Sequence, residues 1–134
     1  MTDWREQTRH QLARLPEAAR QTARIYENGE VAWPNEHAAF AIEALADAGF
    51  LILGLDARTH HPDGSLSEVP VSDYSPGLFY TGAEGLHRGA VPRVTPTPEA
   101  RRDAALNDVD FAAAHGDFVL ITFSPPEDPM DAKH

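Results

Sequence analysis

The run Gly49-Phe50-Leu51-Ile52-Leu53-Gly54-Leu55-Asp56 decides the fold of this chain. It is apolar on both faces where it begins, as expected of a strand that is covered on both sides. We therefore predict a strand over Phe50–Ala57, with Asp56 at its end capping backbone amides of the next loop. A Pro62-Asp63-Gly64 turn follows, so Leu66–Asp73 is predicted to return beside this strand as a β-hairpin.

The returning segment has features of an edge strand. Val69 and Val71 share one of its faces, and Pro70 cannot donate a ladder hydrogen bond, which favours the edge of a sheet. A third strand is predicted over Phe118–Phe123, because two prolines end that apolar run. Its direction does not follow from the sequence.

Helical spacing of apolar residues marks the other elements. The clearest helix begins at Pro34, ends before Gly49 and turns Ala38, Ile42 and Leu45 to one face. A helical pattern also runs from Trp4 to Tyr26, kinked or divided at Pro16, and stops at Asn28-Gly29. A last helix begins at Thr97 and runs towards His115, with a possible break at Asn107-Asp108.

These elements predict an α+β fold. We expect a small, mainly antiparallel sheet of about three strands packed with two or three helices. One domain would cover 1–126, followed by a disordered tail at 127–134. The segment 75–98 is rich in glycine and proline and is expected to be an irregular loop.

Composition narrows the possible functions. The 134 residues carry a net charge of -10, so we expect no nucleic-acid partner. The charges are separated, because five arginines lie in the first 24 residues and ten acidic residues lie between Ile25 and Pro92. There is no cysteine, no signal-peptide pattern and no apolar run of about 20 residues, so we expect a cytoplasmic protein without a membrane contact.

The sequence shows no catalytic motif. No serine lies in a nucleophile elbow and no lysine follows a phosphate-binding loop. The adjacent His60 and His61 lack the spacing of metal ligands, and we expect them to be exposed loop residues. Asp56 and Asp73 leave opposite strands of the hairpin and are expected to lie far apart, which argues against a carboxylate pair. We predict no catalytic residue, metal or cofactor.

An acidic stripe on the Pro34–Asp47 helix is the strongest candidate for a binding surface. Its members recur at helical spacing, within about 60° of one another around the axis. They are Glu36, Phe40, Glu43 and Asp47. An aromatic residue surrounded by carboxylates on a solvent-facing side is a plausible anchor for a protein partner. The alternative is that another segment of the chain covers Phe40.

Residues 31–75 resemble a family of bacterial immunity proteins that pair with polymorphic toxins, the immunity protein 40 family. The resemblance consists of a helix, a strand with Gly54 and Asp56, a turn, and a returning strand with Asp73. Leu55 replaces the second glycine of the family's strand motif. The tryptophan that follows the aspartate in the family is absent, and Tyr74 or Tyr80 would take its place.

The resemblance implies a non-catalytic protein that binds and neutralises a cognate toxin in the same bacterial cell. An acidic surface would suit a toxin with a basic cleft, such as a nuclease domain. The predicted partner-binding residues are those of the acidic stripe, followed by Asp56, Asp73 and Tyr74. Two alternatives remain: a small enzyme that uses an aspartate with His60 or His61, and a module that self-associates into a homo-oligomer.

Overall fold

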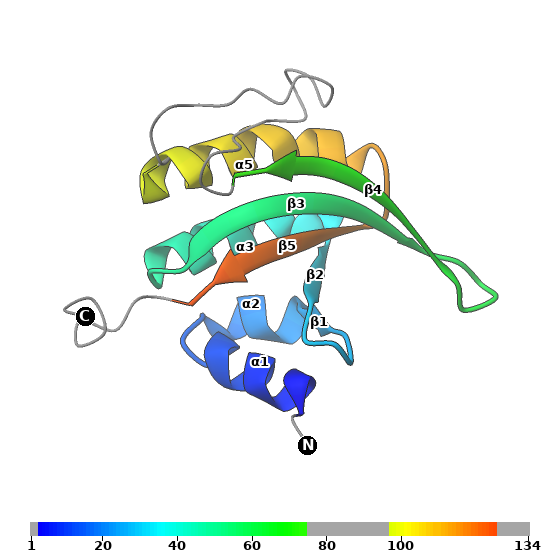
Figure 1. Cartoon of the computed structure of the whole chain (residues 1–134), viewed down its shortest axis with the longest axis horizontal. Coiled ribbons are helices and arrows are strands. Elements are labelled where there is room, and N and C mark those ends of the chain that lie inside the picture. The colour runs from blue at the N-terminus through cyan, green and yellow to red at the C-terminus, as the bar shows by residue number, and fades with distance from the viewer. Residues whose placement is uncertain (1–2, 75–96, 126–134) are drawn as a thin grey trace.

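The computed structural model describes residues 3–74 and 97–125 and shows one five-stranded antiparallel sheet (Figure 1). The strand order is β1-β2-β5-β3-β4. The strands are β1 (Arg24–Ile25), β2 (Val31–Pro34), β3 (Leu51–His60), β4 (Leu66–Asp73) and β5 (Phe118–Ser124). The predicted α+β class is confirmed. The predicted number of about three strands is too low, because two short strands at the β1 edge were not foreseen.

The central strand β3 is longer than predicted. It pairs with β4 on one side as far as His60 and with β5 on the other side as far as Arg58. Asp56 therefore lies inside the strand, opposite Pro70 of β4 and Leu120 of β5, and not at its end. Pairing with both neighbours extends the strand through Arg58, and pairing with β4 extends it further to His60. The predicted edge position of β4 is confirmed.

The hairpin of β1 and β2 replaces the end of the predicted N-terminal helix. Helical structure stops at Thr22, and Arg24 then pairs with Ala32. The turn between the strands contains Gly29 with a φ of 91°, and the Tyr26 amide donates to the Glu30 carbonyl oxygen. Asn-Gly is a common hairpin turn. Here it joins two strands that were too short to show an alternating pattern.

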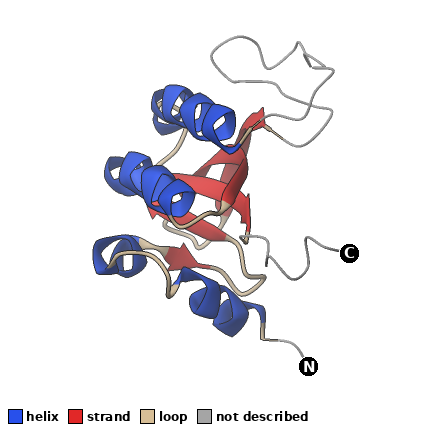
Figure 2. Ribbon diagram, turned by 90° about the vertical axis from the view of Figure 1, so that its left-hand side faces the viewer, coloured by secondary structure: helices blue, strands red, loops and turns tan. Residues whose placement is uncertain are grey.

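Four helices belong to the described residues. They are α1 (Trp4–Leu12), α2 (Glu17–Thr22), α3 (Asn35–Asp47) and α5 (Pro98–Ala113). Pro16 divides the first two, and Thr97 caps α5 as predicted, with its side chain accepting from the Ala100 amide. The helix α5 continues through Asn107 without the predicted break. Figure 2 shows α3 and α5 on one side of the sheet, with the N-terminal helix α1 below it.

The core lies between this helical layer and one face of the sheet. On β3 the buried side chains are Ile52, Leu55 and Ala57, and β5 adds Val119 and Ile121. The helices contribute mainly small and branched residues: Ala38, Ala41, Ile42, Leu45, Ala105, Val109 and Ala112. Alanines let α3 and α5 lie close to the strands. The predicted tail at 127–134 and most of the predicted loop at 75–98 lie outside the described residues.

A buried polar contact fastens α5 to the end of β4. The Tyr74 hydroxyl donates to the Asp108 carboxylate at 2.5 Å and accepts from the Ser72 hydroxyl at 2.8 Å. Burial, followed by the hydrogen bond with Asp108, raises the pKa of Tyr74, so its hydroxyl keeps the proton that it donates. Arg101 of the same helix is also buried and donates to the Tyr74 carbonyl oxygen.

We predict that Tyr74→Phe destabilises the protein by about 1–3 kcal/mol, because the buried Asp108 carboxylate loses a donor. Equilibrium unfolding in denaturant would measure the change. Tyr26→Phe is the comparison, since the Tyr26 hydroxyl bonds to His60 in a part-buried position and its loss should cost less. Equal losses in the two variants would contradict a special role for the Tyr74–Asp108 contact.

Candidate functional site

The exposed side of α3 carries the acidic stripe. Glu36, Glu43 and Asp47 are exposed, and 45% of the Phe40 surface is accessible to solvent. The described segments therefore leave almost half of the Phe40 surface uncovered, although an aromatic ring would gain about 1.5–3 kcal/mol from full burial. Exposure of a large apolar side chain among carboxylates makes this side of α3 a candidate contact surface.

The sequence of α3 explains why this side faces solvent. Ala38, Ile42 and Leu45 point into the core and fix the rotation of the helix. At its start, the Asn35 side-chain amide donates to the Gly116 carbonyl oxygen at 2.7 Å, which ties α3 to the segment that precedes β5. With one face and one end held, the residues on the far side cannot turn inwards.

A hollow of about 420 Å³ lies beside Phe40. The ring forms its wall together with Glu43 and Asp47 of α3, and Arg14 and Pro16 of the α1–α2 corner lie opposite. The stripe is therefore part of a concave surface with an aromatic side, two carboxylates and one guanidinium. Glu36 lies one helical turn further towards the start of α3 and is not among the residues that line the hollow.

Asp56 belongs to a different surface, the face of the sheet opposite the helices. Arg58, two residues further along β3, is 7% exposed although it lies on this face. Its guanidinium forms an ion pair with Glu68 of β4 and another with Glu30 at 3.3 Å. The same guanidinium lies 4.7 Å from the centre of the Tyr26 ring, within the range of a cation–π contact.

This polar cluster perturbs Asp56. Burial raises the pKa of Asp56 to about 6, and the negative charges of Glu68 and Glu30 add to the effect. Arg58 and a hydrogen bond from the Val71 amide work in the opposite direction and are weaker than the sum of the raising effects. The sequence predicted a capping role for Asp56. The cluster with Arg58 was missed because Tyr26 and Glu30 reach it only through the unforeseen β1–β2 hairpin.

His60 completes the cluster at the end of β3. Its Nε2 atom lies 2.8 Å from the Tyr26 hydroxyl, and its ring packs edge-on to Phe118 with centroids 4.6 Å apart. Burial, then the charges of Arg24 and Arg58, lower the pKa of His60, which favours the neutral ring. The four-residue separation from Asp56 along an extended strand is roughly 13 Å. That separation is too long for direct proton transfer between the two side chains.

The other predicted residues of the hairpin are separated from the α3 surface. Asp73 lies opposite Gly54, only two residues along β3 from Asp56, so the expectation that the two aspartates lie far apart is wrong. The register brings them close because Asp73 ends β4 where β3 is still in its first half.

Tyr74 is fully buried, so its side chain does not contribute to a surface. Asp73 and Tyr74 therefore belong to the hairpin and the core more than to a contact surface.

The histidine pair diverges. The His61 ring bonds to the Ser67 hydroxyl at 2.6 Å, whereas His60 bonds to Tyr26. Within residues 3–74 and 97–125, no three acidic or histidine side chains are grouped as metal ligands. In the same part of the chain, none of the helices combines the length and the apolar character that crossing a bilayer requires.

Comparison with protein-family models, with curated proteins and with solved structures finds no match for this chain.

We predict that Asp56→Asn stabilises the protein above pH 6 by about 1 kcal/mol. This is less than the free energy that corresponds to the whole pKa shift of Asp56, because the carboxyl group is partly solvated. The folded state holds the Asp56 proton up to about pH 6, whereas the unfolded chain releases it near pH 4. The wild type therefore loses stability as pH rises between these values, and the asparagine variant does not. Denaturant unfolding at pH 4 and pH 7.5 would measure the difference.

Asp63→Asn serves as the control of opposite sign. Hydrogen bonds from Ser65 lower the pKa of this exposed carboxylate, so its contribution is present at neutral pH and is lost as pH falls. If Asp56→Asn is less stable than the wild type at pH 7.5, the ionised Asp56 carboxylate does not destabilise the folded state, and the prediction is wrong.

Proposed function

We propose that this chain is a non-catalytic immunity or inhibitor protein, which binds a basic toxin domain through the exposed side of α3. The observation that carries the proposal is the position of Phe40, an exposed aromatic ring that lines a hollow together with Glu43 and Asp47. The resemblance to immunity proteins is an independent argument from the sequence. In this function the protein blocks its partner by occupying a surface, without turnover.

The charge of the stripe sets the chemistry of the partner. Three carboxylates face solvent on α3, and the whole chain carries a charge of -10. Such a surface attracts a basic cleft and speeds diffusional encounter, which is the useful property for an inhibitor of a toxic enzyme. The Phe40 ring would supply apolar contact area in the centre, and Arg14 across the hollow would orient the partner.

The two alternatives receive less support from the geometry. The enzyme alternative needs an aspartate and a histidine within reach of each other, and the spacing of Asp56 and His60 along β3 does not provide it. Self-association through the β4 edge is disfavoured by Pro70 and by the irregular register between Leu55 and Asp56. Prolines and bulges are devices that keep an edge strand from pairing with another chain.

We predict that the double variant Glu43→Lys/Asp47→Lys binds the toxin at least about tenfold more weakly, through a slower association at low salt. The partner would be captured from host lysate with the wild type, identified by mass spectrometry and expressed for kinetic measurements. The variant Glu27→Lys/Asp117→Lys is the control, because it changes the same charge at two exposed positions outside α3.

Loss of growth protection against the captured toxin in the α3 variant, but not in the control, would support the proposal. Equal affinity of wild type and α3 variant for the toxin would remove α3 from the interface. Capture of a partner without toxic activity would contradict the immunity function itself.

We predict that Phe40→Ala weakens the same complex about 30-fold through faster dissociation, the effect expected of an apolar anchor. Unlike the charge reversal, this loss should remain at high salt. Leu66→Ala is the matched control, because Leu66 is a similarly exposed apolar residue, at 47%, on the β3–β4 hairpin. Surface plasmon resonance would measure both variants, and an equal effect of the two would contradict an anchor at Phe40.

A further inference from the structure

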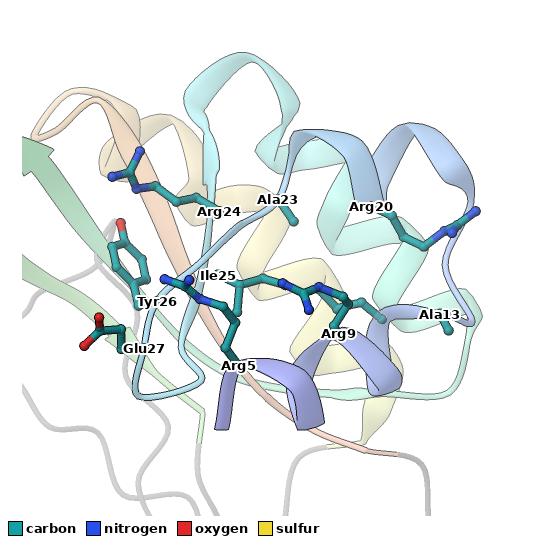
Figure 3. A pocket seen from close by; sticks show the side chains of 10 residues that line it. Arg5, Arg9, Ala13, Arg20, Ala23, Arg24, Ile25, Tyr26 and Glu27 are labelled. Atoms are coloured by element: carbon teal, nitrogen blue, oxygen red, sulfur yellow. The ribbon is translucent and has the colours of Figure 1, made fainter. Parts of the chain in front are cut away.

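A second concave surface lies between α1, α2 and β1, apart from the α3 hollow. The groove has a volume of about 730 Å³, within the usual range for a small-molecule site. Figure 3 shows the side chains that line it. None of them lines the α3 hollow. The proposal below therefore does not depend on the toxin-binding surface.

Positive charge is concentrated in this groove. The lining includes four of the ten arginines of a strongly acidic chain, against one carboxylate, that of Glu27. These arginines are Arg5, Arg9, Arg20 and Arg24. Arg9 forms an ion pair with Glu6 of its own helix. Among the described residues, no carboxylate lies within ion-pair distance of the other three.

Two of the four arginine side chains, Arg5 and Arg9, come together in the groove, whereas Arg20 and Arg24 point away from them (Figure 3). Figure 3 shows Arg5 and Arg9 extending from α1 towards Ile25 of β1, with their guanidinium groups across the opening of the groove. Arg24 approaches from β1 beside the Tyr26 ring, with its guanidinium carbon 5.8 Å from the ring centre. The positive charges of Arg5 and Arg9 repel one another when no anion is bound. A multivalent anion between the two guanidinium groups would attract both of them.

The floor of the groove is apolar. Leu12 is almost fully buried beneath it, and Ala13, Ala23 and Ile25 complete the surface between the arginines. An inorganic ion would contact only the charged rim. A ligand with an uncharged organic body and an anionic end would use both parts, since ligand sites commonly combine an apolar lining with a few polar anchors.

We propose that the groove between α1, α2 and β1 binds an organic phosphate of nucleotide size. Arg5 and Arg9 hold the phosphate groups, because a guanidinium donates two parallel hydrogen bonds to phosphate oxygens. The organic body lies on Leu12, Ala23 and Ile25, with the Tyr26 side chain at the end of the groove. More than one phosphate is favoured, since two separate guanidinium groups reach the opening.

Isothermal titration calorimetry with ATP, pyrophosphate and adenosine at low salt tests the proposal on the full chain. We expect ATP to bind most tightly, pyrophosphate more weakly and adenosine not measurably. The double variant Arg5→Ala/Arg9→Ala should lower ATP affinity by at least about tenfold, since each lost charge-assisted contact weakens binding. Arg14→Ala is the matched control, because it removes an exposed arginine of the neighbouring corner outside the groove.

Thermal unfolding of each variant shows whether the fold is kept, and both arginines of the double variant are exposed, so a small effect on stability is expected. Failure of ATP to bind would overturn the proposal, as would an equal loss of affinity in Arg14→Ala. Pyrophosphate affinity equal to that of ATP would overturn the role of the apolar floor, and adenosine affinity equal to that of ATP would overturn the role of the arginines.

Discussion

The pairing of β3 with strands on both sides is the constraint on which the rest of the structure depends. Its register places Leu55 opposite Ile121 in the core and Asp56 opposite Leu120 on the other face. A slip of one residue would exchange the two faces and move the aspartate into the apolar layer. Gly54 reinforces the register, because a Cβ atom there would lie 2.7 Å from the Ser72 carbonyl oxygen of β4.

The two faces of β3 therefore have different surroundings. One face is covered by α3 and α5, and the Tyr74–Asp108 hydrogen bond holds α5 in place. The other face gathers Arg58 with its acidic and aromatic neighbours from β4 and the β1–β2 hairpin. Burying this guanidinium is tolerable because two carboxylates and a ring compensate its lost hydration. The cluster joins the first hairpin to the second.

The helices bring opposite charges to separate surfaces. Because the core fixes the rotation of α3, its acidic side with Phe40 stays exposed. The turn at Pro16 folds α1 back beside β1 and so collects the N-terminal arginines around one groove. The separation of charge along the sequence thereby becomes a separation in space, with the carboxylates of α3 on one surface and the N-terminal arginines around a groove.

The sequence by itself determined the α+β class, the three longer strands and the core-facing side of α3, because long periodic patterns record which side of an element is buried. It left open whether another segment covers Phe40. Only the tertiary structure decided the β1–β2 hairpin, since strands of two and four residues carry no readable period and depend on β5 as a neighbour. It also decided the positions of Asp56 and Tyr74. Their surroundings come from partners far along the chain, such as Asp108, and no local pattern in the sequence records such contacts.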